Sequence, residues 1–126
     1  MKHGFVKTAA ATPDIRVADV EFNKEQIIRM MDEAAAFGAK VIVFPELCVT
    51  GYTCGDLFTQ EVLLAHAKEA LFEIAAHTKG KDALVFAGVP LSIEGELYNV
   101  AAAMNGGRIL VWLPRHFYRI TESFMR

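Results

Sequence analysis

A run of four consecutive apolar residues at 41–44 lies between two longer segments with helical periodicity. Such a run is typical of a strand that is covered on both faces, because a strand with one face in solvent alternates polar and apolar side chains. A strand of this kind is expected in a layered α/β fold, where helices pack against the sheet.

Both flanking segments have the pattern of amphipathic helices. The first follows Asp19 or Asn23, either of which could cap it, and ends at Gly38. The second is predicted from about 58 to 78 and ends at Gly80. Their apolar stripes predict the core-facing sides, and the stripes consist of Ile27, Met30, Met31, Ala34 and Ala35 in the first helix and Leu64, Ala67, Leu71, Ile74 and Ala75 in the second.

Strands are predicted at five places by short runs of apolar and β-branched residues, namely 5–11, 41–44, 83–89, 97–104 and 108–113. The segment 46–56 reads as an irregular loop or short hairpin, 94–96 as a turn, and the NGG sequence at 105–107 as a hairpin turn, since these residues accept positive φ angles at little cost. The order β-α-β-α-β-β-β predicts an α/β fold with a mixed sheet.

The composition is that of one ordinary globular domain. The chain has 126 residues, of which 53% are hydrophobic and 22% charged, and its net charge is −2. This balance disfavours nucleic acid and anionic membranes as partners. The first residues do not have the pattern of a secretory leader and no apolar run reaches about 18 residues, so we expect neither a leader nor a membrane-spanning helix. A cytoplasmic location is therefore expected, with Cys48 and Cys54 as thiols. The four histidines of the chain are scattered along the sequence, so no metal site is expected.

Glu46 is the residue that most strongly suggests chemistry. It follows the strand at 41–44 after a single proline, and ligand sites in open α/β sheets gather at the carboxyl ends of strands. We expect a carboxyl group there to be partly desolvated and suited to accept a proton near neutral pH. The alternative is a structural role, in which Glu46 caps a turn or pairs with a lysine.

Residues 44–52, FPELCVTGY, resemble the F-P-E-L-x-x-T-G-Y signature of the nitrilase, or carbon-nitrogen hydrolase, superfamily. Four further motifs are similar to the glutamine-hydrolysing domain at the N-terminus of glutamine-dependent NAD synthetases: AAATP at 9–13, VADVEFN at 17–23, GYTCGDLF at 51–58 and LYNVA at 97–101. The resemblance runs from about 4 to 114, so residues 1–126 are expected to be an incomplete carbon-nitrogen hydrolase domain with a divergent tail at 115–126.

The resemblance implies a nitrilase-type α-β-β-α sandwich with a Glu-Lys-Cys triad. Glu46 matches the glutamate, the general base that activates the cysteine, and Tyr52 matches a tyrosine that borders the glutamine pocket. It also implies hydrolysis of L-glutamine to glutamate and ammonia, which a separate synthetase domain uses with ATP and deamido-NAD in an oligomeric enzyme. No cofactor is expected in the hydrolase domain itself.

The tail departs from the family pattern. The family's lysine falls in a segment like G-K-I-L-x-x-V-P-K, and residues 107–115 read GRILVWLPR, which places Arg115 at the lysine position. Arginine keeps the charge but offers donors in a different geometry, so the exchange is not conservative for a residue that stabilises an oxyanion. Thr121 stands where the family has a tyrosine and Ser123 where it has a second glutamate, and no C-Y-D motif with the nucleophilic cysteine follows.

Three hypotheses remain open from the sequence. The first is the N-terminal portion of a glutamine amidotransferase domain, truncated or shifted in frame near Val111 and inactive alone. A second is a non-catalytic module that pairs with a nitrilase-fold partner or with itself, because half of a two-sheet sandwich leaves an apolar face uncovered. The third is a small hydrolase that uses Cys48 or Cys54 as nucleophile.

Overall fold

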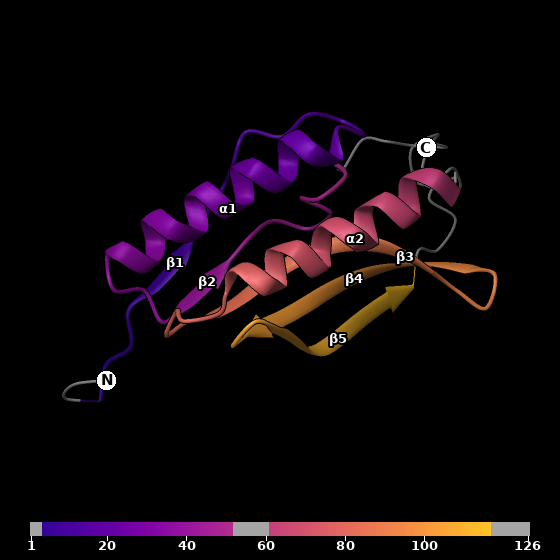
Figure 1. The fold of residues 1–126 in the computed structure, drawn as a ribbon. Helices are drawn as coiled ribbons and strands as arrows, with labels where there is room; N and C mark the ends of the chain where they lie inside the picture. Colours follow the sequence, from indigo (N-terminus) through magenta and orange to yellow (C-terminus); the bar gives the residue numbers. More distant parts are fainter. Residues whose placement is uncertain (1–3, 52–60, 117–126) are drawn as a thin grey trace, which may run out of the picture.

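The computed structural model describes residues 4–51 and 61–116 (Figure 1). Its elements follow the order predicted from the sequence, and they are β1 (Thr8–Ala10), α1 (Val20–Ala36), β2 (Val41–Val43), α2 (Glu61–His77), β3 (Leu84–Ile93), β4 (Glu96–Asn105) and β5 (Arg108–His116). The first strand is shorter than predicted, and the last three extend beyond their predicted ends. The predicted start of the second helix at 58 lies outside the described residues.

The five strands form one mixed sheet in the order β1-β2-β3-β4-β5. β1, β2 and β3 run parallel, whereas β3, β4 and β5 pair antiparallel. Both antiparallel connections are tight, and the second is the predicted hairpin turn, with φ angles of 62° at Gly106 and 84° at Gly107. At the first, Glu94 and Gly95 also have positive φ, which matches the twist of the flanking strands.

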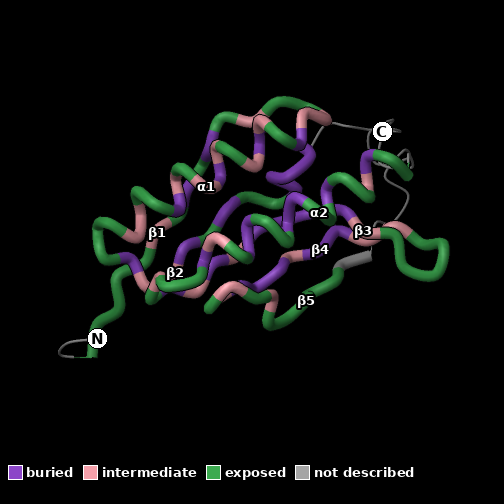
Figure 2. The backbone as a smooth tube through the Cα atoms, in the orientation of Figure 1, coloured by how far each residue is buried: buried purple, intermediate pink, exposed green. Residues whose placement is uncertain are grey.

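Both helices lie on the same face of the sheet and share its core (Figure 1). Figure 2 shows buried segments where the helices meet the strands and exposed segments along β5. Met31 is fully buried, as predicted, and Met30 packs at the edge of the core. In α2 the first buried leucine is Leu63, whereas Leu64 is only partly buried, so the predicted stripe is shifted by one residue there.

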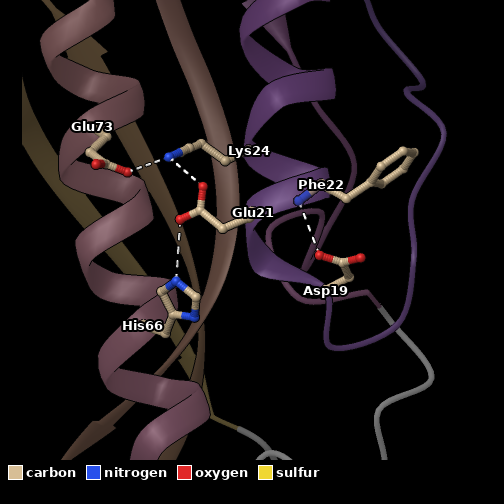
Figure 3. A network of polar contacts seen from close by, with 6 residues as sticks. All are labelled: Asp19, Glu21, Phe22, Lys24, His66 and Glu73. Carbon is tan, nitrogen blue, oxygen red and sulfur yellow. Dashed lines mark hydrogen bonds and ion pairs between the residues drawn. The ribbon is translucent and has the colours of Figure 1, made fainter.

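Asp19 is the residue that caps α1, since its Oδ1 accepts a hydrogen bond of 3.1 Å from the backbone N–H of Phe22 (Figure 3). The sequence left Asn23 open as an alternative, but Asn23 lies inside the helix and its side chain is fully buried. At the other ends of the helices, Gly38 and Gly80 take φ angles of 85° and 82°, as expected for helix-terminating glycines.

Charged side chains join the two helices across their outer surface. Lys24 Nζ lies 2.8 Å from Glu21 on the same helix and 2.7 Å from Glu73 on α2, and His66 Nε2 lies 3.3 Å from Glu21 (Figure 3). Closer to the ends of the helices, His77 lies 3.1 Å from a carboxylate oxygen of Asp32. His66 and His77 are thus surface residues, as predicted.

The opposite face of the sheet carries apolar side chains without a second layer among the described residues. In β3, Val85, Ala87 and Val89 are buried toward the helices, so Phe86 and Gly88 face the other way. On this open face Val43 is 44%, Val111 46% and Leu113 50% exposed. The expectation that the strand at 41–44 is covered on both faces is therefore wrong for the described part of the chain, where only the helix side is covered.

Candidate active site

Glu46 lies where the sequence placed it, in a turn that begins after the carboxyl end of β2. The chain on both sides of this turn stays beside β3, because the N–H of Phe44 donates to the carbonyl of Phe86 (2.9 Å) and that of Val49 to the carbonyl of Gly88 (3.2 Å). The turn itself closes with a bond of 2.8 Å from Gly51 N–H to Leu47 O. Glu46 is therefore held on a short backbone segment with fixed ends.

Gly88 lets this turn approach the sheet closely. A Cβ atom at Gly88 would lie 2.4 Å from the backbone nitrogen of Leu47 and 3.2 Å from Cα of Glu46. Leu47 has a φ angle of 54°, which is uncommon for a residue with a branched side chain and marks a constrained backbone. The position of Glu46 thus depends on the absence of a side chain at position 88, which glycine provides.

Asn23 fastens the same turn to the helix layer. Its Nδ2 donates to the carbonyl of Val49 (2.9 Å) and to that of Arg16 (2.8 Å), and its Oδ1 accepts from Arg16 N–H (2.7 Å). A bond of 2.7 Å from Ala18 N–H to Thr50 O adds to this link. The motifs at 17–23 and 44–52 are thus two halves of one structural unit, which sequence reasoning did not foresee.

Asn99 contacts the candidate base directly. Its Nδ2 donates a hydrogen bond to Oε1 of Glu46, and only 9% of the residue is exposed. From the sequence, Asn99 stands out only as part of the LYNVA motif at 97–101 that could line an interface, although an amide within the otherwise apolar part of the strand at 97–104 was a detectable signal of a site residue. The Cα atom of Arg115 lies opposite that of Asn99 in the β4–β5 pairing, so the backbone brings position 115 beside the residue that binds Glu46.

Glu46 borders a hollow of about 400 Å³ on the open face of the sheet. The hollow is lined mainly by apolar residues, including Val43, Phe44, Pro45, Phe86 and Ala101. Glu46 itself is exposed, so the expected partial desolvation is not present in the described structure. The physical reason is that the described residues place no layer over this face, which leaves the hollow open to solvent.

Cys48 is not among the residues that line this hollow, and it packs in the core. It is 2% exposed, its Sγ lies 3.8 Å from the carbonyl of Gly88, and burial raises the pKa of its thiol to about 12. Such a thiol is protonated at neutral pH and is a poor nucleophile. The other predicted site residue, Tyr52, lies outside the described residues, as do Cys54, Thr121 and Ser123.

Across residues 4–51 and 61–116, no group of three histidine, cysteine, aspartate or glutamate side chains is arranged to bind a metal ion. Neither of the helices in these ranges is long and apolar enough to cross a bilayer.

The family model for carbon-nitrogen hydrolases matches residues 7–123, a range that includes Glu46, Asn99 and Arg115. The chain belongs to the carbon-nitrogen hydrolase family. This membership agrees with the resemblance read from residues 44–52.

Two relatives show which carbon-nitrogen hydrolases it is similar to. Glutamine-dependent NAD(+) synthetase from Aquifex aeolicus is 38% identical over 101 residues, which cover 80% of this chain and 18% of the relative. The corresponding protein of Mycobacterium tuberculosis is 29% identical over 123 residues, or 98% of this chain and again 18% of the relative. The chain therefore spans less than a fifth of the curated relatives that it matches.

Solved structures confirm the nitrilase-type fold. The glutamine-dependent NAD(+) synthetase from Cytophaga hutchinsonii superposes with a TM-score of 0.83 at 31% identity, over 89% of this chain and 19% of that one. An amidase from Nesterenkonia superposes with a TM-score of 0.69 at 19% identity, over 89% of this chain and 43% of the amidase. The mixed sheet with two helices on one face is thus part of the nitrilase-type fold in this carbon-nitrogen hydrolase.

Proposed function

We propose that this chain carries the general-base part of a glutamine-hydrolysing site, of the kind that supplies ammonia for the amidation of deamido-NAD. The single observation that supports this most is the position of Glu46. It lies in the turn after β2, bound by Asn99 and bordering a hollow on the sheet. The similarity to glutamine-dependent NAD synthetases indicates glutamine as the substrate.

In the proposed reaction, Glu46 takes the proton of a cysteine thiol as the sulfur attacks the side-chain amide carbon of glutamine. The proton then passes to the leaving nitrogen, ammonia departs and a thioester remains, which water hydrolyses to glutamate. A cation at position 115 would stabilise the oxyanion of each tetrahedral intermediate. Tyr52 would border the glutamine pocket.

The nucleophile is proposed to come from outside these 126 residues. Cys48 is buried and its thiol has a pKa of about 12, so it offers almost no thiolate to the hollow that Glu46 borders. The resemblance implies a nucleophile in a C-Y-D motif, which neither Cys48 nor Cys54 matches, so we propose that the chain alone does not hydrolyse glutamine. Arg115 would weaken the site further, because a guanidinium presents its donors in a planar fork rather than as a compact point charge.

A chimera tests this function. Residues 7–114 would replace the matching segment of the Aquifex aeolicus relative, and ammonia release from glutamine would be measured for the chimera and for the isolated chain. The chimera should release ammonia, and the isolated chain should not. Glu46→Gln should abolish the activity of the chimera, whereas Glu25→Gln on α1 should leave it unchanged. Ammonia from the isolated chain, or an active Glu46→Gln chimera, would refute the proposal.

A second candidate function rests on the open face of the sheet. Val43, Val111 and Leu113 are each about half exposed there, and exposed apolar side chains gathered on one face of a sheet are typical of an interface. The chain would then act as a non-catalytic module that pairs with a second nitrilase-type sheet, including that of another copy. Sedimentation velocity at micromolar concentration tests for this self-association. Leu113→Glu on the open face should dissociate the assembly, whereas Val62→Glu on α2 should not. A monomer at all concentrations contradicts this candidate.

A further inference from the structure

We infer that Asn99 is a positioning residue, which holds the carboxylate of Glu46 in place at β4, the strand that pairs with the one carrying position 115. The inference rests on the proposed function for the identity of Glu46 as the base. It adds a residue to the site and specifies how that residue acts, through Glu46 rather than on the substrate.

The backbone of Asn99 is fixed on both sides. In the sheet its Cα is paired with that of Pro90 on β3 and with that of Arg115 on β5. A residue in the middle of a three-stranded antiparallel segment cannot shift without breaking pairings on both neighbours. Asn99 is therefore a rigid point from which a side chain can reach the turn after β2, which lies on the far side of β3.

The side chain of Asn99 faces the same surface as Glu46. Asn99 pairs with Pro90, and the alternation along β3 turns Val85, Ala87 and Val89 toward the helices, so Pro90 and its partner Asn99 lie on the open face. There the amide Nδ2 donates to Oε1 of Glu46. This contact spans 53 residues of sequence and joins β4 to the carboxyl end of β2.

Glu46 is thus held at both ends. Its backbone is set by Gly88, where a Cβ would lie 3.2 Å from Glu46 Cα, and its carboxylate is bound by Asn99. An amide is suited to this role because its NH₂ group is a donor at every pH at which the protein is folded. A leucine at 99 would fill similar space without a donor, and an aspartate would place two carboxylates together.

Asn99 should accordingly affect turnover more than substrate binding. In the chimera, Asn99→Leu should lower kcat by about 100-fold with little change in KM, the size of effect expected from a small misplacement of a reacting group. Asn105→Leu is the matched control, because Asn105 is an amide on the same strand whose Nδ2 donates to the carbonyl of Ala83 (2.7 Å). It should leave kcat unchanged. An Asn99→Leu chimera as active as the unmodified chimera would overturn the inference.

A second measurement does not depend on activity and uses the chain itself. In ¹H–¹⁵N NMR spectra, the side-chain NH₂ signals of Asn99 should shift in Glu46→Gln relative to the unsubstituted chain, because the variant replaces the carboxylate that accepts their hydrogen bond. The NH₂ signals of Asn105 should stay in place in both proteins. If the Asn99 signals do not respond to Glu46→Gln, the positioning role is wrong even if the chimera hydrolyses glutamine. If they respond and the chimera is inactive, the contact stands and the proposed reaction fails.

Discussion

A Cβ atom on Gly88 would lie 2.4 Å from the backbone nitrogen of Leu47. Strand β3 and the turn that carries Glu46 therefore pack backbone against backbone, closer than any side chain at position 88 allows. This close contact fixes how near the turn lies to the sheet. The hydrogen bond from Asn99 on β4 to the Glu46 carboxylate depends on that distance.

Gly88→Ala should destabilise the protein, because the atom that it would strike is backbone and cannot rotate away. We expect a loss of about 1–3 kcal/mol in the free energy of unfolding, typical of overpacking. Gly106→Asn is a suitable control, since nothing lies within 4 Å of a Cβ at Gly106 and asparagine tolerates its φ of 62°. Urea denaturation compares the two, and equal midpoints would contradict the close approach at Gly88.

Asn23→Ala should cost about 2–3 kcal/mol of unfolding free energy, since it leaves three backbone partners of a fully buried amide without their hydrogen bonds. Asn105→Ala removes a single bond to the carbonyl of Ala83 and should cost about 1 kcal/mol. Thermal unfolding followed by circular dichroism measures both. If Asn23→Ala is no less stable than Asn105→Ala, Asn23 does not fasten the turn to α1.

Cys48 should resist alkylation in the folded protein. Burial raises the pKa of its thiol to about 12 from an ordinary value of 9.0, so it has on the order of 1,000-fold less thiolate than an ordinary cysteine at pH 8. Peptide mapping after iodoacetamide treatment distinguishes Cys48 from Cys54. Cys48 should be modified only after denaturant is added, and rapid labelling of the native protein would show that it is accessible.

The stability of the helix pair should depend on pH through Glu21. Hydrogen bonds from Lys24 and then His66 lower the pKa of Glu21 below its ordinary value of 4.5. A lowered folded-state pKa means that the stabilisation is complete above pH 4.5 and is lost as the pH falls through the folded-state value. The urea midpoints of wild type and Glu21→Gln should therefore differ at pH 6 and converge at lower pH, while Glu25→Gln should follow wild type throughout. A difference that stays constant with pH would contradict the pairing.

Arg115→Lys should raise the glutaminase activity of a chimera that extends through residue 115. Lysine restores a compact ammonium group at the position that lies opposite Asn99 in the sheet, where the proposed oxyanion forms. We expect an increase of about 10-fold in kcat, which is less than the roughly 100- to 1,000-fold effect of a whole oxyanion donor because arginine already keeps the charge. Arg108→Lys, on the same strand, should have no effect. If Arg115→Lys leaves kcat unchanged, position 115 does not act on the oxyanion.

Much of the fold could be predicted because its signals are local. The apolar stripe around Ile27 and Met31 determines which side of α1 is buried, and Gly38 and Gly106 mark ends and turns by their ability to take positive φ. The alternation of strands and helices followed by consecutive strands predicts the mixed sheet. The motif around Glu46 also identifies the family, since its residues are adjacent in sequence.

The sequence by itself therefore determined the order of the elements, the turns and the identity of the candidate base. Only the tertiary structure decided that Asn23 binds Val49 rather than capping a helix, that Asn99 binds Glu46, and that Cys48 is buried. The first two contacts join residues 26 and 53 positions apart. They depend on strand order and register, which arise from the packing of the whole sheet and leave no periodic signal along the chain.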